Sequence, residues 1–332
     1  MKSVLLKGLV AACLLACRFA QGDSPGRGLD AVQLSGTGYV RLTFWAQSND
    51  FEVGWVKRDE TLLLSKGSTR VQVTVDSCDA RINGIEVWLL HPVANHNGFI
   101  YIASQDLQKT FHPILSPPKV AHTTPIKTIC LDAGHGGKDP GFSVNGHEEK
   151  KYTLLLAQEV KQQLVKAGFK VLFTRATDTA VELPDRPDLA RRRQADLFVS
   201  LHFNATENGA QNVAGTEVYC LTPPGASSTN DHGESATDQK FAGNAQNDRN
   251  LFLAYQMQKS LTRILGAEDR GVRRARFVVL RDAPMPAVLI EAGFMSHPDE
   301  GKKIFDAGYR RRIARSIVEG IQAYKHTVDQ TG

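Results

Sequence analysis

The spacing of apolar and polar positions changes near residue 116, and this change divides the chain into two parts. In the first part Val71, Val73 and Val75 alternate with polar residues, which is typical of a half-buried strand. Asn83-Gly84 separates two short apolar runs and indicates a hairpin. We therefore predict a small β-rich accessory domain over residues 30–115.

The second part begins after a Pro/Thr-rich stretch, residues 116–125, which we predict to be a linker. Short apolar runs then alternate with segments of helical periodicity, the pattern of a layered α/β domain, here predicted over residues 126–326. The predicted strands cover residues 126–131, 169–174, 197–201, 215–221, 277–280 and 287–290. The predicted helices cover residues 152–167, 183–194, 248–265, 300–305 and 310–324.

The first residues have the pattern of an export signal, which we place at residues 1–22. Two lysines precede the apolar run Leu9–Ala16, which is too short to span a bilayer. The segment Leu14–Cys17 resembles the lipobox of bacterial lipoproteins, in which the cysteine is acylated and anchors the protein to the membrane. Ordinary cleavage after Gly22 is the alternative. Both predict an exported protein of the periplasm or cell envelope.

Composition adds few constraints. The 332 residues are 42% hydrophobic, enough for one large and one smaller core, and the formal charge is +5. Arginine runs at 191–193 and 310–312 fall in helical patterns without interleaved aromatic residues, so they indicate solvated helix faces and no nucleic-acid partner. Beyond the signal, Cys78, Cys130 and Cys220 are an odd number without close spacing, which argues against a disulfide framework.

Three predicted strands are each followed by a residue that can bind metal or transfer protons. His135 follows the first strand, His202 ends the strand at 197–201, and Glu291 ends the strand at 287–290. Ligands gather at the carboxyl ends of strands in open α/β sheets. With Glu148 or Glu149, which precede a helix, the two histidines would form a two-His, one-Glu zinc site with a fourth position open for water.

Glu291 would then be the free carboxylate of the site. Hydrolysis of an amide needs a group that takes the proton of the attacking water and delivers it to the leaving nitrogen, a task that Glu291 could perform. The alternative is a carboxylate buried in a structural salt bridge. We disfavour it because a charge directly after an apolar strand is costly.

These residues stand in four ordered motifs that resemble the zinc-dependent N-acetylmuramoyl-L-alanine amidases of the family 3 type. The resemblance covers about residues 127–324 and implies a mostly parallel sheet sandwiched by helices. It implies that His135, Glu149 and His202 bind Zn²⁺, which selects Glu149 over Glu148, and that Glu291 is the catalytic acid/base. The implied reaction cleaves the amide between N-acetylmuramic acid and L-alanine in peptidoglycan. The motifs are Leu131–Gly141, Glu149–Leu154, Ala195–Ala205 and Gly271–Phe294.

The first part of the chain resembles the N-terminal domain of copper amine oxidases, through Ile82–Ile85 and Asn97–Ile102. The resemblance implies no copper here, because the nearby histidines lack companions at ligand spacing. Binding of the cell wall or of a partner, and simple spacing from the membrane, all remain open as roles for this region.

The sequence leaves a choice between functional and structural roles for several further residues. Asn204 and Arg186 are candidates for binding substrate carboxylates or for orienting the metal ligands, and structural roles suit them equally. Arg273, Arg274 and Arg276 could meet an acidic stem peptide, although a solvated loop is the favoured interpretation.

The polar segment 222–247 is predicted to be a long loop or an insertion. Some relatives carry a helix there that blocks the zinc. Glu234 and His232 are the candidate occluding groups in this chain.

Two other functions remain as alternatives. A zinc peptidase that cuts within the stem peptide would use the same metal chemistry. A non-catalytic wall-binding module or activator would not need Glu291, which is why we disfavour it. An activator protein is a further possible partner of an amidase.

Overall fold

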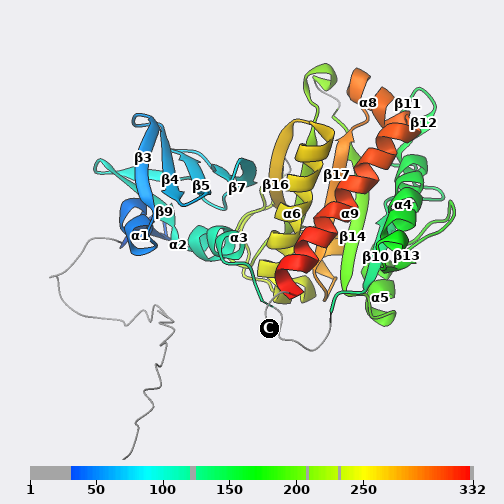
Figure 1. Ribbon diagram of the computed structural model, residues 1–332, viewed down its shortest axis with the longest axis horizontal. Coiled ribbons are helices and arrows are strands. Elements are labelled where there is room, and N and C mark those ends of the chain that lie inside the picture. The colour runs from blue at the N-terminus through cyan, green and yellow to red at the C-terminus, as the bar shows by residue number, and fades with distance from the viewer. Residues whose placement is uncertain (1–30, 120–124, 207–208, 231–232, 330–332) are drawn as a thin grey trace, which may run out of the picture.

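The computed structural model describes residues 31–119, 125–206, 209–230 and 233–329 (Figure 1). They form the β-rich N-terminal region and the larger α/β region that the sequence predicts. The predicted signal, with Cys17, and part of the predicted linker lie outside the described residues. Among the described helices, none combines the length and apolar character needed to cross a membrane.

The N-terminal region contains short strands, one helix between the second and third strands, and a helical stretch at its end. In its hairpin, Asn83 and Gly84 have φ values of 51° and 85°, as the tight turn predicted from their types requires. Val71 and Val73 are fully buried and alternate with less buried neighbours, as predicted, whereas Val75 follows the end of the strand and is only partly buried. The elements are β1 (Ala31–Leu34), β2 (Thr37–Arg41), α1 (Leu42–Ser48), β3 (Glu52–Lys57), β4 (Thr61–Lys66), β5 (Thr69–Thr74), β6 (Asp79–Ile82), β7 (Ile85–Trp88), β8 (Ala94–His96), β9 (Phe99–Ala103), α2 (Ser104–Asp106), the π-helical turn η1 (Leu107–Phe111) and α3 (His112–Leu115).

The α/β region alternates strands and helices, as predicted. Two of its longer helices end at glycines with positive φ, Gly168 after α4 and Gly266 after α6. The elements are β10 (Thr128–Ala133), β11 (Ser143–Val144), β12 (His147–Glu148), α4 (Glu149–Lys166), β13 (Lys170–Phe173), α5 (Asp185–Arg192), β14 (Leu197–Asn204), the 3₁₀ turn η2 (Ala210–Asn212), β15 (Thr216–Leu221), the 3₁₀ turn η3 (Ala242–Gln246), α6 (Asn247–Leu265), β16 (Asp269–Ala275), α7 (Val278–Arg281), β17 (Ala287–Phe294), α8 (Pro298–Phe305) and α9 (Ala307–Asp329).

The main sheet has the strand order β13-β10-β14-β17-β15-β16-β7-β6-β5-β4-β3. In the α/β region its pairs are parallel except β15–β17, so the predicted mostly parallel sheet is confirmed there. Helices α4, α6 and α9 cover one face of these strands (Figure 1). Helices α5 and α7 lie on the other side, where a second apolar cluster packs. The carboxyl ends of β10, β14 and β17 therefore meet at one edge.

The two regions share this sheet. Strand β7 of the N-terminal region pairs in parallel with β16, with Val87 opposite Val272. A 4-stranded sheet, in the order β1-β2-β9-β8, completes the N-terminal region. The domain limits at residues 116–125 remain a prediction, but backbone pairing continues from one region into the other.

Two segments differ from the sequence prediction. Residues 277–280 were predicted as a strand, but Val278–Arg281 form helix α7; a four-residue apolar run does not distinguish the two. Residues Asp269–Ala275, with arginines that suggested a solvated loop, form strand β16 inside the sheet. Arg273 and Arg274 are only 6% and 2% exposed. Their charges are compensated by specific partners, which the linear pattern does not reveal.

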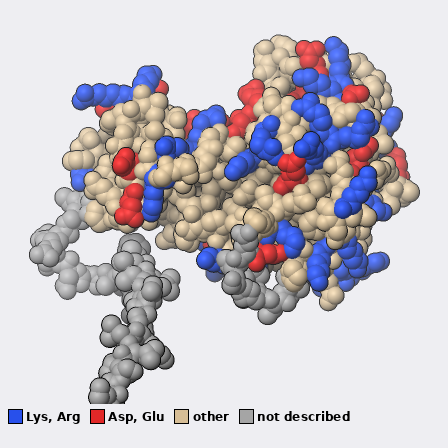
Figure 2. Space-filling model, in the orientation of Figure 1, with Lys and Arg blue, Asp and Glu red and all other residues tan. Residues whose placement is uncertain are grey.

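Charged side chains lie mainly over the helices. Figure 2 shows Lys and Arg gathered over the helices of the α/β region, with Asp and Glu between them. This arrangement agrees with the interpretation of the excess positive charge as solvated helix faces. Cys130 and Cys220 are buried and unpaired, as expected for small core residues.

Candidate metal centre

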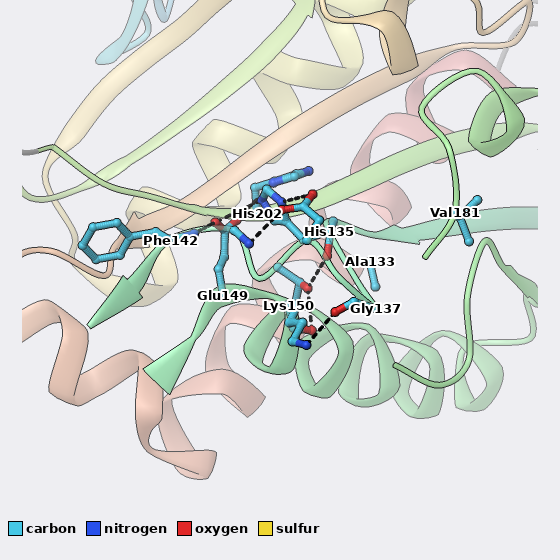
Figure 3. Close-up of polar contacts among 12 residues, drawn as sticks. Ala133, His135, Gly137, Phe142, Glu149, Lys150, Val181 and His202 are labelled. Carbon is cyan, nitrogen blue, oxygen red and sulfur yellow. Dashed lines mark hydrogen bonds and ion pairs between the residues drawn. The ribbon is translucent and has the colours of Figure 1, made fainter. Parts of the chain in front are cut away.

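Three side chains from separate elements converge at the carboxyl edge of the sheet (Figure 3). His135 lies in the loop after β10, Glu149 is the first residue of α4, and His202 lies near the end of β14. Glu149 Oε2 lies 3.1 Å from His135 Nε2, and Glu149 Oε1 lies 3.1 Å from His202 Nδ1. One potential ligand atom from each residue lies within 4.8 Å of the others, so the group could hold a metal ion. Two imidazole nitrogens and one carboxylate are a donor set that suits catalytic zinc.

The Glu149 carboxylate is fixed from several sides. The backbone N–H groups of Phe142 and Phe203 donate to its two oxygens, each at 3.1 Å. Burial raises the pKa of this carboxyl, but the hydrogen bonds and charges of His135 and His202 outweigh burial and hold the pKa well below its usual range. Glu149 is therefore an ionised, oriented carboxylate, as a metal ligand must be.

The ring of His135 is oriented by a second carboxylate. Asp139 Oδ2 lies 2.8 Å from His135 Nδ1, so Nδ1–H can donate to Asp139 while Nε2 faces Glu149. Burial lowers the pKa of His135, but the carboxylates of Glu149 and Asp139 raise it overall. A carboxylate behind a ligating histidine fixes the tautomer and increases its basicity toward a metal. His135 also adopts a φ of 62°, uncommon for a non-glycine residue and typical of constrained sites.

Two glycines allow the candidate ligands to come this close. A Cβ on Gly134 would lie 2.2 Å from His202 Cε1, inside van der Waals contact. A Cβ on Gly141 would lie 2.6 Å from Glu149 Oε2, and its φ of 64° also favours glycine. These two glycines of the first motif are therefore needed for space at the candidate metal centre.

We expect Gly134→Ala to weaken zinc binding at least about tenfold, the size of effect seen when groups that orient ligands are disturbed. The added methyl group would force the His202 imidazole away from Glu149. Competition against a chromogenic chelator measures the affinity. Gly54→Ala is the control, because a Cβ there meets nothing within 4 Å. An unchanged zinc affinity in Gly134→Ala would contradict the role assigned to this close contact.

Glu291 lies next to the candidate ligands in β17. It stands directly opposite His202 in the register of β14 and β17. Its Oε2 atom is buried and has no hydrogen-bond partner among the described residues. Burial, followed by the charges of Glu149 and Glu217, raises the pKa of Glu291 well above its ordinary value. A carboxyl group with this environment is a candidate for proton transfer.

The candidate metal centre opens into a cavity of about 580 Å³. The three candidate ligands and Glu291 line it together with Asn204 and Arg276. Its apolar wall is formed by Phe142, Leu183, Phe277, Val278, Val279 and Leu289. A cavity of this size with a few convergent polar groups suits a small-molecule or peptide segment as substrate.

Arg186 also lines the cavity, but its guanidinium is bound to the protein. Nη1 donates to Asp132 Oδ1 at 2.9 Å and to Ala133 O, while Nη2 donates to His135 O at 2.9 Å. Nε donates to Val181 O, and Arg186 is only 3% exposed. These contacts orient the loop that carries His135, which is the second of the two roles considered for Arg186.

We expect Arg186→Met to lower the free energy of unfolding by about 3–5 kcal/mol, because the fully buried Asp132 would lose its charged partner. Denaturant unfolding measures the loss. The control is Arg191→Met on the same helix, α5, whose side chain is 58% exposed and whose ion pair with Asp188 is worth at most about 1 kcal/mol. Equal stability losses in the two variants would contradict this account of Arg186.

Asn204 is held at the cavity wall by two bonds. Its Nδ2 donates to Glu217 Oε1 at 2.7 Å, and its Oδ1 accepts from Ala205 N at 2.7 Å. An amide has a second N–H and a second lone pair, so Asn204 retains capacity for a substrate.

The segment 222–247 is tied back to the body of the protein. Glu234 accepts a hydrogen bond from Ser228 Oγ and one from Arg276 N, the latter at 2.9 Å. His232 lies outside the described residues. None of the described residues of this segment lines the cavity, so the structure gives no support to occlusion by Glu234.

Two carboxylates at this edge have no role that the sequence pattern predicts. Asp139 lies four residues after His135, a spacing that could have suggested it. Glu217 comes from β15, far from the other motifs in sequence, and only the antiparallel pairing of β15 with β17 brings it opposite Glu291.

Comparison with known proteins identifies the α/β region. A family model described as N-acetylmuramoyl-L-alanine amidase matches residues 129–323, more than half of the chain. The chain belongs to this family. It is therefore an amidase of peptidoglycan, as the sequence resemblance implied. The N-terminal region matches the model described as copper amine oxidase N-terminal domain over residues 29–113, which confirms the second resemblance.

Individual amidases agree with this assignment. N-acetylmuramoyl-L-alanine amidase AmiA of Escherichia coli is 32% identical over 251 residues, which cover 69% of this chain and 86% of AmiA. The solved N-acetylmuramoyl-L-alanine amidase of Clostridium difficile matches with a TM-score of 0.52 at 31% identity. The match covers 63% of this chain and 100% of the solved chain. The CwlD amidase of Clostridioides difficile, solved in complex with the GerS lipoprotein, has a TM-score of 0.51 at 27% identity and covers 60% of this chain and 99% of its own.

Proposed function

We propose that this amidase is zinc-dependent, with His135, Glu149 and His202 as ligands and Glu291 as the catalytic acid/base. The observation that carries the proposal is the placement of Glu291 directly beside His202, next to three ligand atoms within 4.8 Å of one another. Bound zinc would supply Lewis acidity, lowering the pKa of a coordinated water and polarising the scissile carbonyl.

The protein's own groups would perform the remaining steps. Asp139 holds the His135 ring so that Nε2 faces the metal position. Glu291 accepts the proton of the attacking water and delivers it to the leaving nitrogen of L-alanine. A raised pKa suits both halves of that transfer, because such a carboxyl group exchanges protons more readily near neutral pH.

Asn204 is the proposed substrate contact, through the amide N–H and lone pair that its bonds to the protein leave available. The apolar wall of the cavity would limit the access of bulk water to the scissile bond. Arg186 is proposed as the residue that holds the His135 loop, since its donors are bound to Asp132 and backbone carbonyls.

Digestion of purified peptidoglycan, with and without added zinc, tests the function when the products are identified by mass. An amidase releases whole stem peptides and leaves glycan strands without peptide. Shortened stems still attached to muramic acid would instead support the zinc peptidase alternative. No release from intact wall by the zinc-loaded protein would support a non-catalytic module.

We propose further that the protein is exported to the periplasm or cell envelope, with residues 1–22 as the signal. Acylation at Cys17 or cleavage after Gly22 would be distinguished by the mass of the mature N-terminus. A partner protein that activates the enzyme is also proposed, because CwlD has been solved with the GerS lipoprotein.

A further inference from the structure

A row of polar contacts connects the cavity to the N-terminal region along one face of the sheet. It runs from Asn204 on β14 to Glu217 on β15, then to Arg273 on β16 and Trp88 on β7. The first of these residues lines the cavity, and the last belongs to the region that matches the copper amine oxidase N-terminal domain. Nothing in the proposed mechanism uses the middle of the row.

Glu217 is the centre of the row. It is only 3% exposed, and its carboxylate accepts hydrogen bonds from Asn204 Nδ2 at 2.7 Å and from the Tyr219 hydroxyl at 2.8 Å. The guanidinium Nε atoms of Arg273 and Arg270 lie 3.1 and 3.4 Å from its Oε2. A buried carboxylate remains ionised and in place only when such partners compensate its charge. The position of Asn204 therefore depends on Glu217, and Glu217 depends on the two arginines.

Trp88 contacts the side chain of Arg273 and the backbone of Arg270. The guanidinium of Arg273 lies over the Trp88 ring, 4.3 Å from its centroid. The indole Nε1–H donates to the backbone oxygen of Arg270 at 3.2 Å. A cation over an indole face is attracted to the ring, so the partly buried Trp88 helps to keep the guanidinium on the side that faces Glu217.

We propose that Glu217 is a positioning residue that holds Asn204 for substrate binding, and that Trp88 of the N-terminal region keeps Glu217 in place through Arg273 and Arg270. The N-terminal region then contributes to the substrate-binding site, in addition to any role in localising the protein. The proposal rests on the assignment of Asn204 as a substrate contact of the amidase.

The first test replaces the carboxylate with an amide of the same shape. Glu217→Gln loses both ion pairs and, where its NH₂ group faces Asn204, it opposes the donor Asn204 Nδ2 with a second donor instead of accepting its hydrogen bond. With a soluble muropeptide as substrate, we expect KM to rise about fivefold, the effect of one hydrogen bond, and kcat at each variant's pH optimum to stay within about twofold. Asn204→Ala should raise KM similarly, and the double variant should be no worse than either single variant. A purely structural role would lower the active fraction and hence kcat, leaving KM unchanged.

The second test acts from the N-terminal region. Trp88→Leu in the full chain should raise KM about threefold, through the loss of a single cation–π contact and one hydrogen bond. Trp88→Phe keeps an aromatic face for Arg273 and should recover part of the loss. The control is Trp55→Leu, which removes a tryptophan that is 43% exposed on β3 and has no contact with Glu217. The proposal would be overturned if Trp88→Leu and Glu217→Gln both had the same KM as the wild type and the Trp55→Leu control.

Binding without turnover separates this inference from the proposed function. In a Glu291→Ala background, the Kd for the same muropeptide is measured by calorimetry with and without Glu217→Gln. A fivefold weaker Kd supports the positioning role even if the wild-type protein fails to cleave the amide. An unchanged Kd, in a protein whose wild type does cleave it, refutes the positioning role and leaves the amidase function intact.

Discussion

Replacing Glu291 with glutamine or alanine is expected to lower kcat by about 10²–10⁴-fold, the contribution typical of general acid–base catalysis. The glutamine side chain keeps the shape of the glutamate but cannot take a proton from water or return one to the leaving nitrogen. Release of stem peptides from peptidoglycan measures the loss. Zinc content should be unchanged in both variants, because Glu291 is not among the three converging ligand side chains.

The stability of the Glu291 variants provides an independent check. Glu291 Oε2 is buried and has no hydrogen-bond partner in the part of the chain that the structure describes, and burial is the main cause of the raised pKa of Glu291. Removing such a carboxyl group relieves a desolvation cost, so the free energy of unfolding should stay the same or increase. A clear loss of stability would indicate the structural salt bridge considered as the alternative. Near wild-type kcat in Glu291→Ala would contradict the proposed mechanism.

Removal of the metal is the second large effect expected. Treatment with a strong chelator should abolish activity, and stoichiometric zinc should restore it, because the coordinated water is the proposed nucleophile. Zinc at one hundred times its Kd should also stabilise the folded protein by about 2.7 kcal/mol, measured as a rise in the unfolding midpoint. Activity that persists at full level in the chelated protein would rule out zinc dependence.

Two adjacent glutamates test the ligand assignment. Glu149 is 5% exposed and contacts both histidines, whereas Glu148 lies nearer the surface, 3.5 Å from Lys150 Nζ. Glu149→Ala should therefore lose both the zinc-dependent stabilisation and the activity. Glu148→Ala should retain both. The opposite result would assign the ligand to Glu148, which the sequence spacing alone left possible.

Local sequence determined at which edge of the sheet the candidate catalytic and metal-binding residues lie. The short apolar runs before His135, His202 and Glu291 form the parallel strands β10, β14 and β17, and their carboxyl ends meet because parallel strands share a direction. Apolar spacing likewise predicted a helix from residue 152, directly after Glu148 and Glu149, and the structure begins α4 at Glu149. These features depend on the types and spacing of neighbouring residues, so they could be predicted without a tertiary structure.

Only the tertiary structure decided what surrounds that edge. Asp269–Ala275 contains three arginines, and such a segment becomes a buried strand only when Glu217, Trp88 and backbone carbonyls compensate its charges. Those partners come from other elements, up to 186 residues away for the bond between Arg274 and Trp88 O. The same applies to Arg186, whose role depends on the buried Asp132 beside it. A buried charge is compensated by residues that are neighbours in three dimensions, so periodicity along the chain could not reveal these partners. For the same reason it could not reveal that one sheet joins the N-terminal region to the amidase region.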